Sequence, residues 1–230
     1  IIRRKDRMQQ DSCNKYCKGT ACTSFSFTKE IQERSDLNRT LLVSLDIESL
    51  FTNVPVSETI DIILRKLYPH DSIIYHGFDR NDFCSLLKLA VEDSYFSFDD
   101  KLHRQIDGMA MGSPLGPLFA NIFLSHYESE WLSNAPIKPL LYRRYVDDTL
   151  WLLPPDSDLS LLMSYMNTRQ VNMRFTYESE SNACIHFIGL IITHNVAENN
   201  THRYVTSVYR KPTSTSLFMN FNSFVPLMYR

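Results

Sequence analysis

The chain has 230 residues, of which 43% are hydrophobic and 22% charged, a profile typical of one or two globular domains with a substantial core. Its formal net charge of -2 argues against a simple nucleic-acid-binding module, because such modules normally carry a basic excess. The sequence contains neither a long apolar run nor a signal-peptide pattern, so we expect no membrane insertion and a nuclear or cytoplasmic location.

The first part of the chain, residues 1–24, is polar and without a clear period, and we predict a poorly determined leader there. Five cysteines form an odd set, which argues against a disulfide framework. Cys13, Cys17 and Cys22 lie near one another and could bind zinc, although no fourth Cys or His is close in sequence. The role of this cluster stays open.

The first regular element is an apolar strand, Leu41–Ile47. Alternation places Leu45 and Ile47 on one face and Ser44 and Asp46 on the other. We therefore expect Asp46 at the end of a core strand, facing away from its most apolar side.

Two helices and a hairpin follow. Pro55 can open the first helix and Pro69 stops it. The second begins near Asp79 and is expected to bury a stripe made of Phe83, Leu86, Leu87, Ala90 and Val91. Residues 95–98 and 102–106 then form a hairpin around Asp99, Asp100 and Lys101.

Three of the six glycines in the chain fall between Gly108 and Gly116, where a third predicted helix begins, between Ser113 and Pro117, and runs as far as Trp131. Small residues let a ligand lie against the backbone. Ser113 is a good N-cap and Pro114 a good first helical residue, so free N–H groups at the helix start would face this loop. The alternative is a glycine-rich turn that only starts a buried helix.

Two strands, Leu140–Val146 and Thr149–Leu153, are predicted to be joined by a turn at Asp147 and Asp148. A helix at 156–168 and three strands at 171–177, 185–193 and 203–209 complete the chain. Helices and antiparallel strands mixed in this order predict an α+β fold, in which helices pack on one face of a sheet.

Adjacent aspartates in a turn are common surface residues, because Asp suits turns. Asp46 changes their interpretation, since it stands at the end of another core strand that can lie beside this hairpin. Three carboxylates in one site repel one another unless a cation neutralises them. Mg²⁺ fits such a site because it prefers a few carboxylate oxygens, waters and substrate phosphates.

Four ordered segments resemble the reverse transcriptases of Penelope-like retroelements. They are Asp46-Ile-Glu-Ser-Leu-Phe-Thr-Asn-Val-Pro55, Met109-Ala-Met-Gly-Ser-Pro-Leu-Gly-Pro117, Arg144-Tyr-Val-Asp-Asp148 and Val208-Tyr-Arg-Lys-Pro-Thr213. The resemblance runs from about Phe25 to the end. It implies a polymerase palm-type sheet with partial fingers over residues 25–230, with a thumb and any endonuclease domain outside this chain.

The resemblance also implies roles for single residues. Asp46, Asp147 and Asp148 would be catalytic and would hold Mg²⁺, with Mn²⁺ as the alternative ion and the Ile47 carbonyl as a further ligand. Phe51 would be an aromatic gate against a ribose 2′-hydroxyl, unless it is only a core residue. The substrate-binding residues would also include Met111, Gly112, Ser113, Pro114, Tyr145 and Val146.

The nucleic-acid contacts implied by the resemblance lie later in the chain. Phe187 and Gly189 belong to a primer-gripping hairpin, and Arg210 and Lys211 would contact phosphates or an adjoining thumb. A solvated basic strand end is the alternative for the last two. The partners would be an RNA template, a DNA primer and deoxynucleoside triphosphates.

The resulting hypothesis is an RNA-directed DNA polymerase core. One alternative is a catalytically incomplete or domesticated fragment that binds nucleic acid or a protein. A viral RNA-copying polymerase is disfavoured by Phe51, because such enzymes must admit the 2′-hydroxyl. Template preference, priming mode, oligomeric state and the activity of this length of chain do not follow from the sequence.

Overall fold

The computed structural model describes residues 23–34, 39–70, 72–92, 94–196 and 202–213. The predicted leader lies outside these residues apart from Thr23 and Ser24, and so does the cluster of Cys13, Cys17 and Cys22. Among the helices that are described, each is too short or too polar to cross a bilayer.

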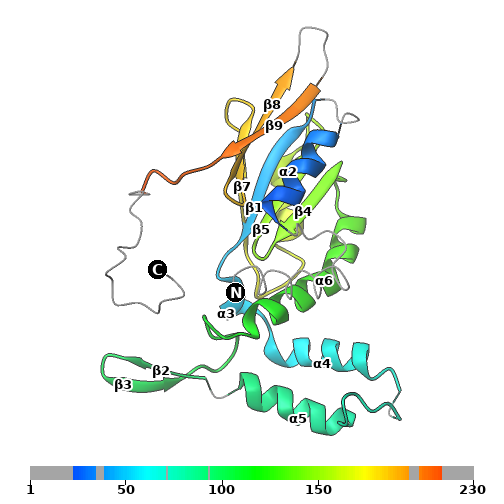
Figure 1. Cartoon of the computed structure of the whole chain (residues 1–230), viewed down its shortest axis with the longest axis vertical. Helices are drawn as coiled ribbons and strands as arrows, with labels where there is room; N and C mark the ends of the chain where they lie inside the picture. Colours follow the sequence, from blue (N-terminus) through cyan, green and yellow to red (C-terminus); the bar gives the residue numbers. More distant parts are fainter. Residues whose placement is uncertain (1–22, 35–38, 71, 93, 197–201, 214–230) are drawn as a thin grey trace.

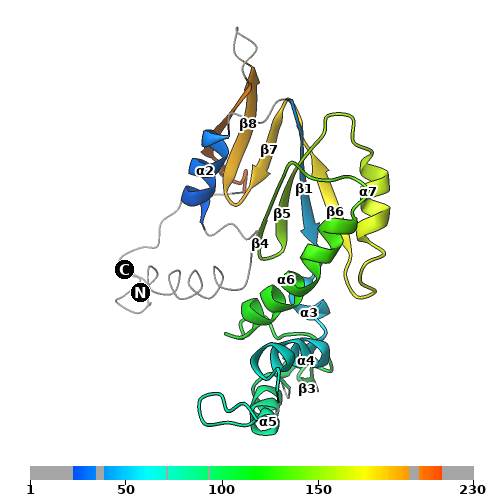
Figure 2. The ribbon, with the colours of Figure 1, turned by 90° about the vertical axis from the view of Figure 1, so that its right-hand side faces the viewer.

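A four-stranded antiparallel sheet forms the centre of the molecule, in the order β4-β5-β1-β6 (Figures 1 and 2). Its strands are β1 (Leu41–Ile47), β4 (Leu141–Tyr145), β5 (Asp148–Leu153) and β6 (Phe175–Ser179). The range predicted for β1 is confirmed. The strand predicted at 171–177 begins later, because residues 171–174 lead into β6 as a turn and loop.

A second sheet of three strands contains β7 (Cys184–Phe187), β8 (Leu190–Val196) and β9 (His202–Val208). The single strand predicted at 185–193 is wrong, since the chain turns at Ile188 and Gly189. Both residues have positive φ, 44° and 75°, which closes a tight turn between β7 and β8. The second sheet packs on the first through β7, which contacts β1 and β5.

Apolar residues fill both faces of the central sheet. On one face, α6 (Gly116–Asn134) and α7 (Leu159–Met166) cover Val43, Leu45 and Trp151. On the other face, Leu42 and Leu150 lie under α2 (Ser24–Glu33) and the second sheet. The predicted α+β palm-type class is confirmed; α2, which we did not predict, adds a helix on the opposite face.

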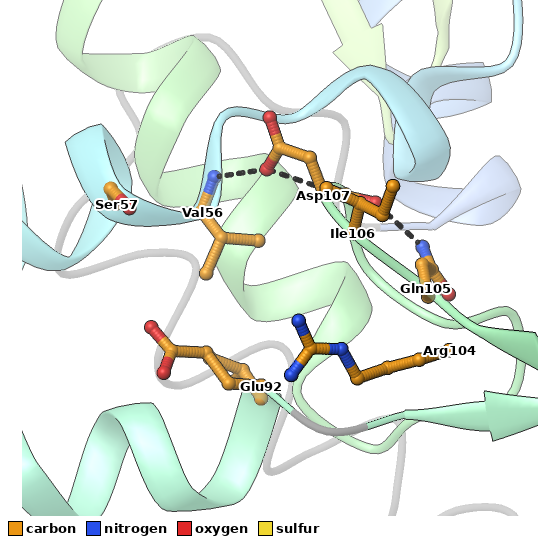
Figure 3. Close-up of a pocket in the computed structure, with 9 residues that line it drawn as sticks. Val56, Ser57, Glu92, Arg104, Gln105, Ile106 and Asp107 are labelled. Carbon is orange, nitrogen blue, oxygen red and sulfur yellow. Dashed lines mark hydrogen bonds between the residues drawn. The ribbon is translucent and has the colours of Figure 1, made fainter.

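Below the sheet in Figure 1 lies a peripheral part, which consists of α3 (Leu50–Asn53), α4 (Val56–Leu67), α5 (Arg80–Val91), β2 (Tyr95–Phe98) and β3 (Lys101–Arg104). The predicted helix starts and the hairpin are confirmed to within about two residues. Asp79 caps α5 by accepting from the N–H groups of Asn81 and Asp82. Figure 3 shows the base of the hairpin, where residues 104–107 meet the start of α4.

The predicted buried stripe of α5 is wrong. Only Val91 is buried, whereas Phe83 and Leu87 are half-buried and Leu86 is exposed. Leu89, on the same helix, is 77% exposed. Helical periodicity identifies an apolar face, but only part of it is covered. Phe83, Leu87 and Val91 pack against the main core, whereas Leu86 and Ala90 stay exposed.

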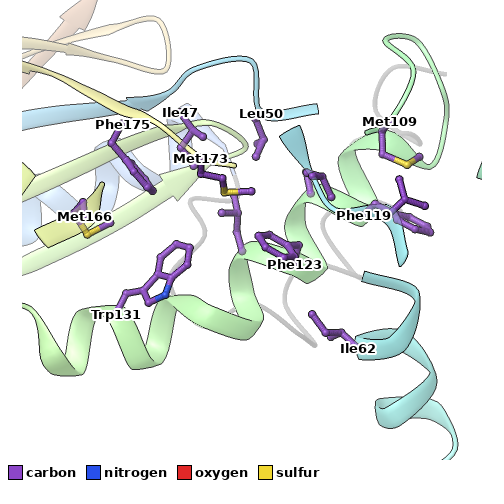
Figure 4. Close-up of a cluster of buried hydrophobic side chains, with 14 of the residues drawn as sticks. Ile47, Leu50, Ile62, Met109, Phe119, Phe123, Trp131, Met166, Met173 and Phe175 are labelled. Carbon is purple, nitrogen blue, oxygen red and sulfur yellow. The ribbon is translucent and has the colours of Figure 1, made fainter. Parts of the chain in front are cut away.

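The largest core cluster joins the central sheet to the peripheral part. Phe123 and Trp131 of α6 lie under the sheet, and Phe119 meets Met109 and the start of the peripheral part (Figure 4). Ile47 and Leu50 belong to the same cluster, so the residues on either side of Glu48 are fixed by burial. The end of β1 is therefore held rigidly against α6.

Candidate active site

The three predicted catalytic carboxylates converge. One carboxylate oxygen from each of Asp46, Asp147 and Asp148 lies within 4.8 Å of the others. Asp46 comes from β1, and Asp148 is the first residue of β5, the strand that pairs with β1. Asp46 is exposed and the other two are half-buried, so the group opens to solvent rather than into the core.

The hairpin between β4 and β5 differs by one residue from the prediction. Tyr145 pairs with Asp148, so the turn residues are Val146 and Asp147. Val146 has a φ of 57°, a left-handed conformation that β-branched residues rarely adopt. The turn thereby presents Asp147 beyond the strand end, while Asp148 stays in register with the sheet.

A buried ion pair holds this hairpin in place. Arg144 is 1% exposed, and its guanidinium donates to the carboxylate of Glu128 on α6. The same guanidinium donates to Asn121 Oδ1 at 2.7 Å and to the Val146 carbonyl at 3.1 Å. Arg144 therefore links α6 directly to the turn that carries Asp147.

The electrostatics of the site favour a bound cation. Although Asp46 is exposed overall, partial desolvation of its carboxyl group, followed by the charge of Asp147, raises its pKa above the usual value. Burial and the charges of Asp147 and Asp46 raise the pKa of Asp148, while Lys211 acts in the opposite direction. A hard divalent ion would relieve this repulsion, and carboxylate oxygens are the donors that such ions prefer.

Beside the carboxylates lies a cavity of about 460 Å³. Its wall includes Asp46 and Asp148 from the central sheet, Gly189 from the turn between β7 and β8, and Lys211 after β9. The remaining lining residues are Ser44, Thr176, Tyr177, Glu178, His186, Phe187, Ile188 and Tyr209. The cavity therefore joins the carboxylates to the two later segments that the sequence singled out.

The turn between β7 and β8 is tied to the segment after β9. The Tyr209 N–H donates to the Gly189 carbonyl at 2.9 Å, and the Tyr209 ring stacks on His186 at 3.9 Å. Phe187 lines the cavity but is only 3% exposed, since its ring packs edge-on against Phe27 of α2. Its burial favours a supporting role in this hairpin, while Arg210 and Lys211 are exposed.

The glycine-containing loop, residues 108–116, lies near Phe51 in α3, the short helix that follows β1. Phe51, in α3, is half-buried, and its ring would lie 3.5 Å from a Cβ atom at Gly116. Met111 is 76% exposed, Gly112 has a φ of 91° and Pro114 is exposed. The helix start predicted between Ser113 and Pro117 is confirmed, because α6 begins at Gly116. Ser113 is not its N-cap, since the Gly116 N–H donates to the Ser113 carbonyl and closes a turn before the helix.

Sequence reasoning missed several residues of the site. Glu128 gave no signal beyond its place on a helix, and its role as the partner of Arg144 depends on tertiary packing. Glu178 raises the pKa of both Asp46 and Asp148 by its charge, and His186 and Tyr209 line the cavity. Tyr209 lies inside the Val208–Thr213 motif, and His186 lies next to Phe187. Their positions beside predicted site residues are the sequence signal that could have identified them.

Residues 6–189 match the profile of the family described as reverse transcriptase (RNA-dependent DNA polymerase). This chain belongs to the reverse transcriptase family. The match covers the first three of the four ordered segments, so the chain carries the nucleic-acid polymerase core of a nucleotidyltransferase family. A search of curated proteins found no match.

Solved structures similar to this reverse transcriptase chain include telomerases. Apo telomerase from Candida tropicalis has 13% sequence identity and a TM-score of 0.62 over 84% of this chain and 39% of that chain. Telomerase from Candida albicans in complex with a TWJ fragment of telomeric RNA has 13% identity and a TM-score of 0.58, over 82% of this chain and 36% of that one. This chain thus spans less than half of these telomerases, and the likeness concerns the fold.

Proposed function

We propose that this chain is the catalytic core of an RNA-directed DNA polymerase, with fingers and palm within residues 25–230. The observation that carries the proposal is the convergence of Asp46, Asp147 and Asp148 within 4.8 Å in a chain of the reverse transcriptase family. These carboxylates come from segments about 100 residues apart, counted from 46 to 147. Catalysis by divalent ions requires several carboxylates close together at a place that solvent and substrate can reach, and these three lie together at a solvent-facing strand end.

Asp46, Asp147 and Asp148 would hold Mg²⁺, with Mn²⁺ as the alternative and the Ile47 carbonyl as a further donor. Bound ions would activate the primer 3′-hydroxyl and neutralise the charge of the leaving pyrophosphate. The protein itself positions the donors. Arg144 fixes the hairpin turn against α6, and burial of Ile47 fixes the end of β1.

The incoming deoxynucleoside triphosphate is assigned to the space between the carboxylates and the loop before α6. Phe51 would exclude a ribose 2′-hydroxyl by steric contact, supported by its position five residues after Asp46 and its half-buried ring. Met111, Gly112, Ser113 and Pro114 would border the nascent base pair. Tyr145 and Val146 would contact the primer end, which their place in the Asp147 hairpin supports.

The RNA template and DNA primer are assigned to the cavity beside the carboxylates. Gly189 and Lys211 line it together with Asp46 and Asp148. Lys211 and the exposed Arg210 would contact phosphates, and Phe187 would support the primer-gripping hairpin from beneath. The similar telomerase structure from Candida albicans contains a fragment of telomeric RNA, which supports nucleic acid as the proposed partner.

The Penelope-like group is the proposed subfamily, supported by the sequence Val208-Tyr-Arg-Lys-Pro-Thr213. A thumb and an endonuclease domain would lie outside this chain, and the protein would act in the nucleus or the cytoplasm. Deletion of residues 208–213 is a direct way to ask whether this motif serves primer binding.

The experiment that tests the proposal is primer extension by the purified chain on an RNA template with a DNA primer, deoxynucleoside triphosphates and Mg²⁺. We expect extension by the wild type and none by Asp147→Ala. Thermal unfolding of both proteins controls for folding. Equal extension by the two proteins would contradict the proposed catalytic site. No extension by a folded wild type that still binds the template would favour the alternative of a binding module.

A further inference from the structure

Two segments far apart in the sequence meet in a close backbone contact, which we call the seam and define as residues 51–56 against residues 105–109. The Met109 N–H donates to the Phe51 carbonyl at 2.7 Å. Gly108 has a φ of 77°, and a Cβ atom there would lie 2.3 Å from the Thr52 carbonyl oxygen. That distance leaves no room for a side chain, so the contact depends on glycine.

The side chain of Asp107 closes the seam from the other side. Its Oδ1 atom accepts from the N–H of Gly108 at 2.8 Å and from the N–H of Val56 at 3.4 Å (Figure 3). Gln105 Nε2 donates to the Asp107 carbonyl at 3.0 Å. Val56 is the first residue of α4, so the carboxylate also lies at the positive end of that helix.

The seam fixes the place of Phe51 from two directions. Its carbonyl is held by Met109, and its ring lies against Gly116, the first residue of α6. Met109 itself is 1% exposed and packs in the core with Phe119 (Figure 4). The loop 110–115 is therefore bounded by two contacts with Phe51: the hydrogen bond from Met109 just before the loop and the contact with Gly116 just after it.

We propose that Asp107 and Gly108 are positioning residues that set the sugar selectivity of nucleotide incorporation. They do so by fixing the Phe51 ring relative to the loop from Met111 to Pro114. Neither residue belongs to the assigned substrate contacts, and both act through the backbone of residues 51–56. The inference rests on the proposed polymerase function and on Phe51 as the gate against the 2′-hydroxyl.

The test is single-nucleotide incorporation with a matched pair of deoxynucleoside and ribonucleoside triphosphates, which gives the ratio of the two kcat/KM values. Gly108→Ala should lower the preference for the deoxy substrate by about 10-fold, because a displacement of about 1 Å at a positioned group has an effect of that order or larger. Asp107→Ala should lower it by a smaller factor. Asp107→Asn keeps an acceptor oxygen and should restore most of the preference.

Gly77 provides a matched control. It has a φ of 86°, and a Cβ atom there would have no neighbouring atom within 4 Å, so Gly77→Ala introduces the same backbone strain without a clash. Its preference ratio should equal that of the wild type. If Gly108→Ala fails to fold, as thermal unfolding will reveal, the Asp107 variants carry the test.

The decisive comparison is a double-mutant cycle with Phe51→Ala. Since the seam acts through Phe51, Asp107→Ala should change the ratio in the wild-type background and leave it unchanged in the Phe51→Ala background. Equal losses with both sugars, or the same change in both backgrounds, would overturn the proposed role while leaving the polymerase assignment intact. Absence of incorporation by the wild type would overturn both.

Discussion

The central sheet and the peripheral part both contain many apolar residues but are held together very differently. In the sheet, Leu45, Leu150 and Leu152 are fully buried, because layers cover both faces. In the peripheral part, Leu89 of α5 is 77% exposed and Leu102 of β3 is 73% exposed. Within the peripheral part α4 is buried, whereas α5 and the β2–β3 hairpin are mostly exposed.

This difference shows which part of the molecule fixes the active site. A site of three carboxylates repels itself, so its geometry needs support from packing and from the buried ion pair between Arg144 and Glu128. Within the described residues, the peripheral part meets the site through the seam and the core around Phe119. Changes of equal size should therefore have unequal effects in the two parts.

The largest expected effect is on catalysis. Asp46→Asn should lower primer extension by about 1,000-fold or more, because it removes a carboxylate donor from the ion site. Glu178→Gln is the matched control, since Glu178 lines the same cavity but is not one of the three converging aspartates. Its loss should stay below about 10-fold in steady-state assays. Similar losses in both variants would mean that overall negative charge, rather than the triad, supports activity.

The second effect concerns the anchor of the hairpin. Arg144→Met leaves Glu128 without its buried partner and should destabilise the fold by about 3–5 kcal/mol, measured by urea unfolding. Arg143→Met is the control, because the Arg143 pair with Glu30 is more exposed and should contribute about 1 kcal/mol or less. A smaller effect at Arg144 than at Arg143 would contradict the anchoring role.

The third effect compares one leucine from each part. Leu45→Ala, in β1, should lower the free energy of unfolding by about 2–5 kcal/mol. Leu89→Ala, on α5, should change it by about 0.5 kcal/mol or less, because its side chain is mostly in water. Chemical denaturation of both variants measures the difference. Equal losses would show that α5 is covered in solution.

The smallest effect is a gain in stability. The pKa of Asp148 is raised in the folded state, so its charged form is disfavoured there. This shift stabilises the fold at low pH, where the carboxyl is protonated. That stabilisation is lost as the pH rises through the folded pKa. Asp148→Asn should therefore raise Tm slightly at pH 7 in the presence of EDTA. Mg²⁺ should stabilise the wild type more than the variant. A lower Tm for the variant in EDTA would contradict the repulsion.

Much of this architecture follows from local sequence signals. The range of β1, the start of α5 at Asp79 and the turn at Asp99 and Asp100 could be predicted, because alternation, capping and turn residues act within a few positions. The meeting of Asp46 with Asp147 and Asp148 was predicted from strand order and from the ordered motifs.

Other features depend on contacts that a local pattern does not contain. Ser113 is a good N-cap residue, yet it lies in a turn, because α6 starts where Gly116 meets Phe51. The strand pattern does not predict the turn at Ile188, since a β-branched residue with positive φ is rare, whereas the resemblance implies a hairpin around Phe187 and Gly189. Periodicity identifies the apolar face of α5 correctly, but whether the residues on that face are buried depends on which elements pack against the helix.

The most direct test of the convergent ion site is a titration of the purified chain with Mn²⁺, followed by electron paramagnetic resonance of the free ion. Saturable binding by the wild type and by Glu178→Gln is expected, with much weaker binding by Asp46→Asn and by Asp147→Asn. Wild-type binding that neither aspartate variant weakens would contradict the claim that these side chains share a divalent ion.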